Sequence, residues 1–559
     1  MTVDSLHVAR LRARYRLPAG EPDARSRLDS LLREVLDEAL ESALDRAGIP
    51  MHEEVCVRTV DAPVRLSLGA PDSALVAAWS VALAGAIRAT LDAGGPDVVR
   101  YRSRSHALVD LLAGVARNDL ARAWAWRQLG LWSAGDAASA EGAADEAARA
   151  LAARPETVVA ALSAAARNGA LPALAARIRP AAWTAVARAA LEAASVPDSA
   201  IPLLLAAPGR SGIPDPASPG ADGTPPAGAP APDTALPTAA AEARRVRRVA
   251  EQSAVARSLR SRLGLAPETR SALAVVAILE AEPSALVRAL SASAALVAAV
   301  EREVFALPSL TSPGPGAEPA ASTSNGDGTG SAAAPGRAQD TAAPHDTPRD
   351  SLMEPAAAPS GRGEAGSEPA DGPIAADAGA DGAASLDARS VGRTRRGGLL
   401  FLLHVVDEME VPREVVESPV FSGRTLRWVL HRLALSLLAL DVRDPAALAF
   451  AGLAPDADPP SRGEEPASDA EIAGVEGIAR RVEARLFERL RGAPAPDARA
   501  AAALLRETTL REATIEADPG WIDVRLSLDE VSVEVRRAGL DLDPGWVPWL
   551  GAAVRFVYA

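Results

Sequence analysis

Cys56 and His52 are residues whose types could form a thiol–imidazole dyad, the pair that activates a cysteine nucleophile. Such a dyad needs a nucleophile held against a base, and the base must itself be oriented by a third group. The sequence around them predicts the beginning of a strand, in which residues four apart are separated by about 13 Å. This spacing disfavours a catalytic dyad.

The histidines and carboxylates do not follow a metal-binding pattern. The six histidines are scattered, and no two of them have the spacing of zinc ligands together with a second pair of cysteines or histidines. Asp541 and Asp543 beside Gly545 resemble part of a calcium loop, but the acidic ligand that should follow is missing, which favours turn residues. We therefore expect no metal and no cofactor.

Motifs of common enzyme classes are also missing. All 59 basic residues are arginine, so the chain has no lysine. This excludes Schiff-base catalysis by lysine and phosphate-binding loops that end in Gly-Lys-Ser/Thr. No Gly-x-Gly-x-x-Gly follows a predicted strand, and no Gly-x-Ser-x-Gly turn is present. We expect that the protein is not an enzyme.

The net charge of −14 argues against a general nucleic-acid binder, because there is no surplus of cations to displace counterions. Cys56 is the single cysteine, which favours a reducing compartment. Residues 1–17 lack the apolar core of a signal peptide. The uncharged run at 73–87 is shorter than the roughly 20 apolar residues of a membrane span. We expect a cytoplasmic protein without a membrane span and without a nucleic-acid partner.

Tryptophans are concentrated near the C-terminus, where Asp-Pro-Gly-Trp occurs at 518–521 and again at 543–546. Pro at the second position and Gly at the third position predict a sharp turn in each copy. Two indoles that bracket a proline are a rigid apolar anchor of the kind that interfaces use. The protein-interaction candidates are Trp521, Trp546, Val547, Trp549 and Leu550. In the alternative interpretation, Trp546 and Trp549 fill the core of the hairpin itself.

The patterns predict a mainly α fold with a small α+β N-terminal domain and a C-terminal β-hairpin unit, in a multi-domain chain with long disordered linkers. Residues 308–395 are the longest linker, because large apolar side chains are too few there to offset the entropy of ordering the backbone. The predicted segments are 1–135 (α+β domain), 136–207 (Ala-rich helices), 208–240 (Pro/Gly linker), 241–307 (helices), 308–395 (acidic linker), 396–453 (helices), 454–470 (linker) and 471–559 (helix plus β-hairpin unit).

Periodicity places the main elements. An apolar stripe predicts a helix from Asp23 to Gly48, and further stripes predict helices at 71–91, 422–440 and 475–490. Alternation of apolar and polar residues predicts strands. The predicted strands lie at 55–57, 64–68, 98–103, 522–528, 531–535 and 554–558.

Three stretches resemble proteins of contractile injection systems, the phage-tail-like particles of bacteria. The helix that ends in Ala-Leu-Asp-Arg-Ala-Gly and the following Val-Arg-Thr-Val-Asp-Ala-Pro-Val-Arg-Leu-Ser-Leu-Gly resemble the amino-terminal part of tape-measure proteins. Gly-Gly-Leu-Leu-Phe-Leu-Leu-His at 397–404 is similar to a block that this family carries after its variable middle. Residues 536–551 are similar to the ends of proteins encoded in the same particle clusters.

The resemblance implies a non-enzymatic assembly factor that contacts baseplate, spike and tube subunits and helps set tube assembly. It transfers no catalytic residue. The chain departs from a helical ruler because it has no long uninterrupted helical repeat, so the roles of ruler and of accessory assembly protein both stay open. The alternative function is a cytosolic adaptor or accessory scaffold that binds a protein partner through its Trp-rich hairpin.

Overall fold

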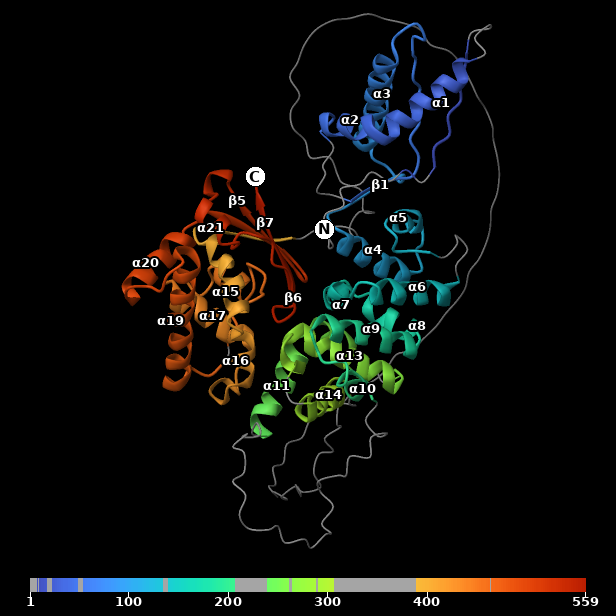
Figure 1. The fold of residues 1–559 in the computed structure, drawn as a ribbon. Helices are drawn as coiled ribbons and strands as arrows, with labels where there is room; N and C mark the ends of the chain where they lie inside the picture. Colours follow the sequence, from blue (N-terminus) through green and yellow to red (C-terminus); the bar gives the residue numbers. More distant parts are fainter. Residues whose placement is uncertain are drawn as a thin grey trace, which may run out of the picture. The chain divides into compact units, whose positions relative to one another are not determined.

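The structure is a computed structural model that describes residues 8, 10–17, 23–48, 54–133, 139–206, 239–260, 264–287, 290–305, 389–462 and 464–559. The described chain is mainly α-helical, with a small sheet near the C-terminus, as the sequence predicts (Figure 1). Most of the predicted linkers 208–240 and 308–395 lies outside the described residues. Residues 390–394 of the second linker form a strand, so that linker ends earlier than predicted.

The first hydrophobic core lies between the N-terminal helices and contains Leu28, Val35 and Trp79. The predicted helix after Asp23 is present, with one π-helical turn in its middle. The predicted strand at 64–68 is not a strand. Its backbone oxygen at Leu68 accepts a hydrogen bond from the guanidinium of Arg27 instead of from a partner strand. The elements are α1 (Ala24–Glu34), η1 (Val35–Ala39), α2 (Leu40–Arg46) and α3 (Asp72–Ala93).

Two short antiparallel strands follow, as the sequence predicts, with Val55 opposite Arg100. They belong to a second core, where Cys56 and Tyr101 are buried together with Trp126. Residues 1–135, predicted as one domain, therefore contribute to two hydrophobic cores. The elements are β1 (Glu54–Val57), β2 (Val98–Tyr101), α4 (Arg104–Arg117) and α5 (Ala123–Gln128).

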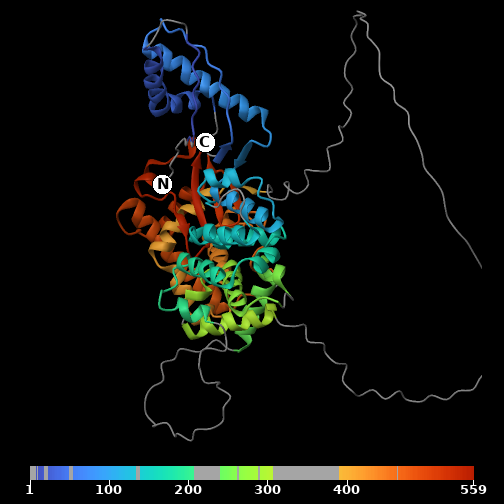
Figure 2. The same cartoon turned by 90° about the vertical axis from the view of Figure 1, so that its right-hand side faces the viewer.

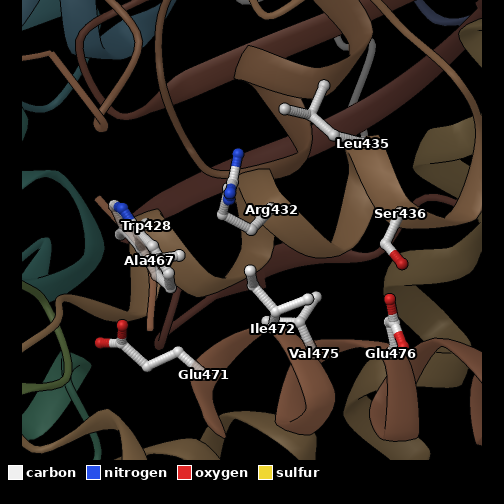
Figure 3. A pocket seen from close by; sticks show the side chains of 9 residues that line it. All are labelled: Trp428, Arg432, Leu435, Ser436, Ala467, Glu471, Ile472, Val475 and Glu476. Atoms are coloured by element: carbon white, nitrogen blue, oxygen red, sulfur yellow. The ribbon is translucent and has the colours of Figure 1, made fainter. Parts of the chain in front are cut away.

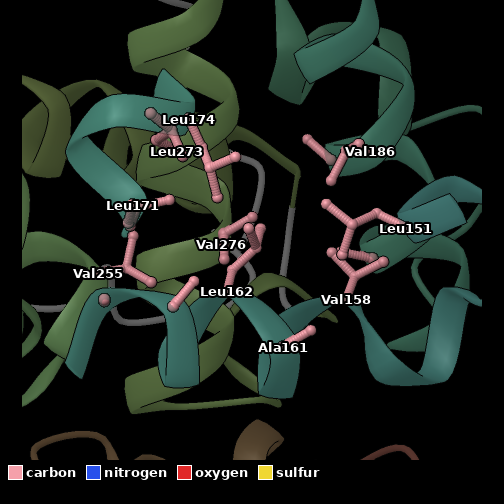
Figure 4. Close-up of a cluster of buried hydrophobic side chains, with 14 of the residues drawn as sticks. Leu151, Val158, Ala161, Leu162, Leu171, Leu174, Val186, Val255, Leu273 and Val276 are labelled. Atoms are coloured by element: carbon pink, nitrogen blue, oxygen red, sulfur yellow. The ribbon is translucent and has the colours of Figure 1, made fainter. Parts of the chain in front are cut away.

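The second core continues through a bundle of short Ala-rich helices. Prolines stand in the first turn of several of these helices, where the missing N–H costs nothing. Both predicted helical segments share this core, since Leu162 and Val276 lie in one cluster (Figure 4). The helices from α6 to α14 are drawn in teal to green in Figure 2. They are α6 (Ala140–Ala152), η2 (Pro155–Thr157), α7 (Val158–Arg167), α8 (Leu171–Arg177), α9 (Pro180–Ala193), α10 (Ile201–Leu205), α11 (Ala239–Gln252), α12 (Ala254–Leu259), α13 (Pro267–Ala281), η3 (Ala285–Val287) and α14 (Leu290–Phe305).

The third core joins helices to a five-stranded sheet of strand order β3-β4-β5-β7-β6. The predicted segments 396–453 and 471–559 share this core. The helical elements are η5 (Gly397–Leu402), α15 (Leu403–Glu408), α16 (Val411–Glu417), η6 (Pro419–Phe421), α17 (Leu426–Leu437), α18 (Pro445–Phe450), α19 (Asp469–Arg491), α20 (Ala498–Thr509), η7 (Leu528–Glu530) and α21 (Val533–Arg537). The strands are β3 (Ser390–Thr394), β4 (Ala513–Asp518), β5 (Trp521–Leu526), β6 (Gly545–Val547) and β7 (Ala552–Tyr558).

The C-terminal sheet differs from a simple hairpin in two ways. Residues 531–535, predicted as a strand, lie largely in the short helix α21, where Val533 is 67% exposed. Strand β7 pairs parallel to β5, and a parallel pair needs a crossover connection, which residues 527–551 supply. The antiparallel hairpin partner of β5 is β4, which the sequence analysis does not predict.

Candidate functional site: the C-terminal tryptophans and the cavity between α17 and α19

Both Asp-Pro-Gly-Trp copies have a left-handed glycine, as predicted, but only the first copy forms the predicted turn, and the second leads directly into strand β6. Gly520 has φ +73° in the two-residue loop that joins β4 to β5, where Asp518 pairs with Trp521. Gly545 has φ +66° at the beginning of β6. A residue with a side chain is strained in this conformation, so glycine at 520 allows the sharp turn before Trp521, and glycine at 545 allows the positive φ at the beginning of β6.

The structure places the five predicted interaction residues at different depths. Val547 and Leu550 are buried in the third core, at 7% and 1% exposure. Trp521, Trp546 and Trp549 are half-buried. The structure therefore divides the predicted set into two core side chains and three indoles that keep part of their surface exposed.

Each of the three indole N–H groups donates a hydrogen bond within the chain. Trp549 Nε1 donates to Asp407 Oδ1 at 2.7 Å. Trp546 Nε1 donates at 2.9 Å to the carbonyl oxygen of Ala193, the last residue of α9, where helical carbonyls lack partners within the helix. These bonds fix the orientation of the rings, so a partner would meet indoles that are already ordered.

Trp521 belongs to a charged network on the face of the sheet opposite to the third core. Its Nε1 donates to Asp523 Oδ1 at 2.8 Å, and Arg555 lies over its ring. Asp523 is 1% exposed and forms ion pairs with Arg555 and Arg389. Burial alone would raise the pKa of Asp523, but the hydrogen bonds from Arg555 and Trp521 outweigh it, and the pKa lies below its usual value. The alternation at 521–525 was the sequence signal for this charged face.

A cavity of about 250 Å³ lies between α17 and α19 (Figure 3). The sequence analysis predicts both helices but not the cavity, because residues from both helices and from the segment before α19 form it. Most of its wall is apolar. The lining residues are Trp428, Arg432, Leu435, Ser436, Ala467, Glu471, Ile472, Val475 and Glu476.

A buried arginine supports one side of this cavity. The guanidinium of Arg424 lies 4.4 Å from the centroid of the Trp428 ring. It forms ion pairs with Glu471 and Glu464, and it donates to the carbonyl oxygen of Pro466. Burial alone would raise the pKa of Glu471, but hydrogen bonds from Arg424 and Ser468 outweigh it, and the pKa is lowered. The same Ser468 and Glu471 form a capping box at the beginning of α19.

Cys56 and Asp543, which were considered for catalysis and metal binding, have structural partners. The thiol of buried Cys56 donates to the carbonyl oxygen of Ala125, and burial, assisted by the charge of Glu54, raises its pKa to about 11. His52 lies outside the described residues. Asp543 Oδ1 accepts a hydrogen bond from the backbone N–H of Phe556. Within the described parts of the chain, no group of three or more His, Cys, Asp or Glu side chains could hold a metal ion.

Helix α3 is longer than the predicted uncharged run. Its 22 residues form a helix that is long and apolar enough to cross a membrane, with a mean hydropathy of 1.6. The η2–α7 segment and α8, which meet at a bend, are also long and apolar enough to cross a membrane if they are taken as one span. One face of α3 packs in the first core through Leu75, Val76 and Trp79. The absence of a membrane span therefore stays a prediction.

Comparison with known proteins found no matching family model, no matching curated protein and no matching solved structure.

Proposed function

We propose that this chain is a structural assembly protein that docks to protein subunits through its C-terminal tryptophans. The observation that carries the proposal is the state of Trp546 and Trp549. Both rings are half-buried, both N–H groups are hydrogen-bonded within the chain, and Pro548 stands between them. A large ring that is already oriented loses little entropy on binding, which is the property of interface anchors.

The resemblance to tape-measure proteins supplies the class of partner. It implies baseplate, spike and tube subunits of a contractile injection particle, which would be assembled in the cytoplasm. The proposed role is to bind these subunits and help set tube assembly.

The described fold favours an accessory assembly role over a ruler. The helices before residue 306 and the elements after residue 388 belong to one compact unit. A ruler stretched between two separate heads would have its ends in separate bodies. If the chain nevertheless acts as a ruler, deletion of about half of 311–390 should shorten the particles seen by negative-stain microscopy. Unchanged particle length would contradict the ruler role.

A pull-down tests the docking surface. The tagged full chain and the variant Trp546→Ala plus Trp549→Ala are incubated with lysate of particle-producing cells, and bound proteins are identified by mass spectrometry. The matched control is Leu528→Ala plus Val533→Ala, which removes two exposed apolar side chains from the same C-terminal unit. Circular dichroism checks that all variants fold.

Wild type and the control variant should recover tube or baseplate subunits, and the tryptophan variant should lose them. Because Trp546 also contacts Ala193, the variant Trp546→Phe keeps an aromatic ring but removes the N–H bond together with the pyrrole part of the indole, and it should bind tube subunits better than Trp546→Ala. Recovery of unrelated partners would instead support the adaptor function. Equal recovery of tube subunits by all variants would exclude the tryptophans as the docking surface.

A further inference from the structure

The cavity between α17 and α19 has the size of a side-chain pocket. Its volume of about 250 Å³ is below the range of roughly 300–1,000 Å³ that is typical of pockets for drug-sized ligands. Its apolar lining comes from the Trp428 ring and from Leu435, Ala467, Ile472 and Val475. Ile472 is 40% exposed, so an apolar group that entered would cover surface that now faces water. The dimensions suit one large apolar side chain of a docked peptide.

Some of the charged side chains around the cavity have ion-pair partners and others do not. The carboxylate of Glu471 is occupied by Arg424 and by Ser468. Arg432 is half-buried, and its guanidinium lies 5.7 Å from the centroid of the Trp428 ring. Among the residues that the structure describes, no carboxylate forms an ion pair with Arg432. Among the described residues, the cavity thus offers one cation without an ion pair, Arg432, and one carboxylate without an ion pair, Glu476. An incoming carboxylate would meet Arg432 beside apolar side chains, where the attraction is stronger than in water.

On the side of the cavity away from Arg432, Ser436 and Glu476 offer hydrogen-bond acceptors. Figure 3 shows the hydroxyl of Ser436 and the carboxylate of Glu476 facing each other, away from Arg432. Both residues are exposed. A carboxylate and a hydroxyl can accept hydrogen bonds from the backbone N–H groups of an extended peptide.

The walls of the cavity are formed before any ligand arrives. Trp428 is 2% exposed, and the guanidinium groups of Arg424 and Arg432 both lie near its ring. Arg424 is itself held by the two carboxylates and the carbonyl oxygen described above. A pocket whose walls are already ordered loses little conformational entropy on binding.

We propose that this cavity binds an acidic peptide segment of a partner protein, in which a large apolar side chain stands next to a carboxylate. The apolar side chain packs against Ile472, and the carboxylate pairs with Arg432. The backbone beside it donates to Glu476 or Ser436. This site is separate from the C-terminal tryptophans, and the inference does not depend on the proposed assembly function.

Fluorescence anisotropy of labelled peptides on the full chain tests the inference. The probe is the peptide Gly-Asp-Leu-Glu-Gly, and two comparison peptides replace Leu by Ala or both acidic residues by Lys. The variants are Arg432→Glu and, as the matched control, Arg480→Glu. Arg432 belongs to α17, whereas Arg480 is exposed on α19 and does not line this cavity. Both variants change the net charge equally.

The expected result is binding of the Leu peptide at least about tenfold tighter than the Ala peptide, and no binding of the Lys peptide. Arg432→Glu should weaken binding of the Leu peptide at least about tenfold, while Arg480→Glu should leave its affinity unchanged. Equal weakening by both variants would show only general electrostatic attraction and would overturn the proposal. Equal binding of the Leu and Ala peptides would overturn it as well.

Two further occupants are distinguished by the same assay. In a variant that lacks 311–384, the Leu peptide should bind as it does to the full chain. If it binds only to this deletion variant, the acidic tract of the chain itself occupies the pocket, and an external partner is excluded. If binding falls as the chain associates at higher protein concentration in sedimentation experiments, a second copy is the occupant and the proposal fails.

Discussion

Gly397 begins the apolar block at 397–404, and its missing side chain is required by the close approach of η5 to β4. An ideal Cβ at this position would lie 2.3 Å from Cβ of Ala513 and 3.3 Å from the carbonyl oxygen of Arg511. Carbon atoms pack best at about 3.5–4.0 Å. The substitution Gly397→Ala therefore forces η5 and β4 apart by roughly 1 Å or more. The methyl group of Ala513 cannot rotate away, because it is attached directly to the buried strand.

The backbone also resists this movement. Gly397 N–H donates to the Arg511 carbonyl oxygen at 2.9 Å, which ties η5 to the segment just before β4. Overpacking of a core costs about 1–3 kcal/mol. Replacing glycine by alanine returns about 0.5–1 kcal/mol through the lower entropy of the unfolded chain. The contact of 2.3 Å with a methyl group that cannot move places this site in the upper part of the overpacking range. We therefore expect a net loss of about 1–2 kcal/mol, which corresponds to roughly 5- to 30-fold more frequent opening.

Amide hydrogen exchange measured by mass spectrometry provides a local assay, which is needed because a chain with several cores does not unfold in two states. Peptides that cover β4 should exchange roughly 5- to 30-fold faster in Gly397→Ala than in wild type. The matched control is Gly477→Ala in α19, where an added Cβ meets no atom within 4 Å. This control should exchange at the wild-type rate or more slowly, since alanine favours helix. If β4 exchanged in Gly397→Ala at the same rate as in wild type, the packing argument would be refuted.

Two further predictions follow from the ionisable groups. The pKa of Glu471 is lowered in the folded chain, so its stabilising contribution is present above its unfolded pKa of about 4.3 and is lost as the pH falls through the folded pKa. Amide exchange in the first turns of α19 should therefore be slower in wild type than in Glu471→Gln at pH 6, and the difference should shrink below about pH 4; a difference independent of pH would contradict the role of the carboxylate. The Cys56 thiol, with its pKa raised to about 11, should react slowly with iodoacetamide at neutral pH and rapidly once denaturant unfolds the chain, because the thiolate is the nucleophile. Equal rates in the folded and unfolded chain would show that the thiol is not buried.

Several local features could be predicted from the sequence because neighbouring residues determine them. The period of 3.6 residues in α19 places Val475, Ile478 and Val482 in the core, and all three are buried there. The period of two residues in β5 correctly places Ile522 and Val524 inward. It fails at the end of the predicted strand, where β5 stops before Leu528, which is 65% exposed in η7.

The candidate site was less predictable than the elements that form it. The turn before Trp521 follows from its Pro-Gly pair, whereas the same pair before Trp546 leads into strand β6 without the predicted turn. The partners of the indoles do not, because the acceptors at Asp407 and Ala193 lie far away along the chain. The arginine that faces the cavity, Arg432, has no local signal that separates it from the many other arginines.

The sequence by itself determined the helical class, the left-handed glycines, the apolar faces and the exclusion of lysine chemistry, because each depends on residue types or on spacing over a few residues. The tertiary structure alone decided which faces meet. It pairs Ser390 with Ala517 across a long separation, and it places β7 parallel to β5. It also forms a cavity from two helices. Such contacts depend on how whole elements complement one another in shape and charge, and no period within one element encodes its partner.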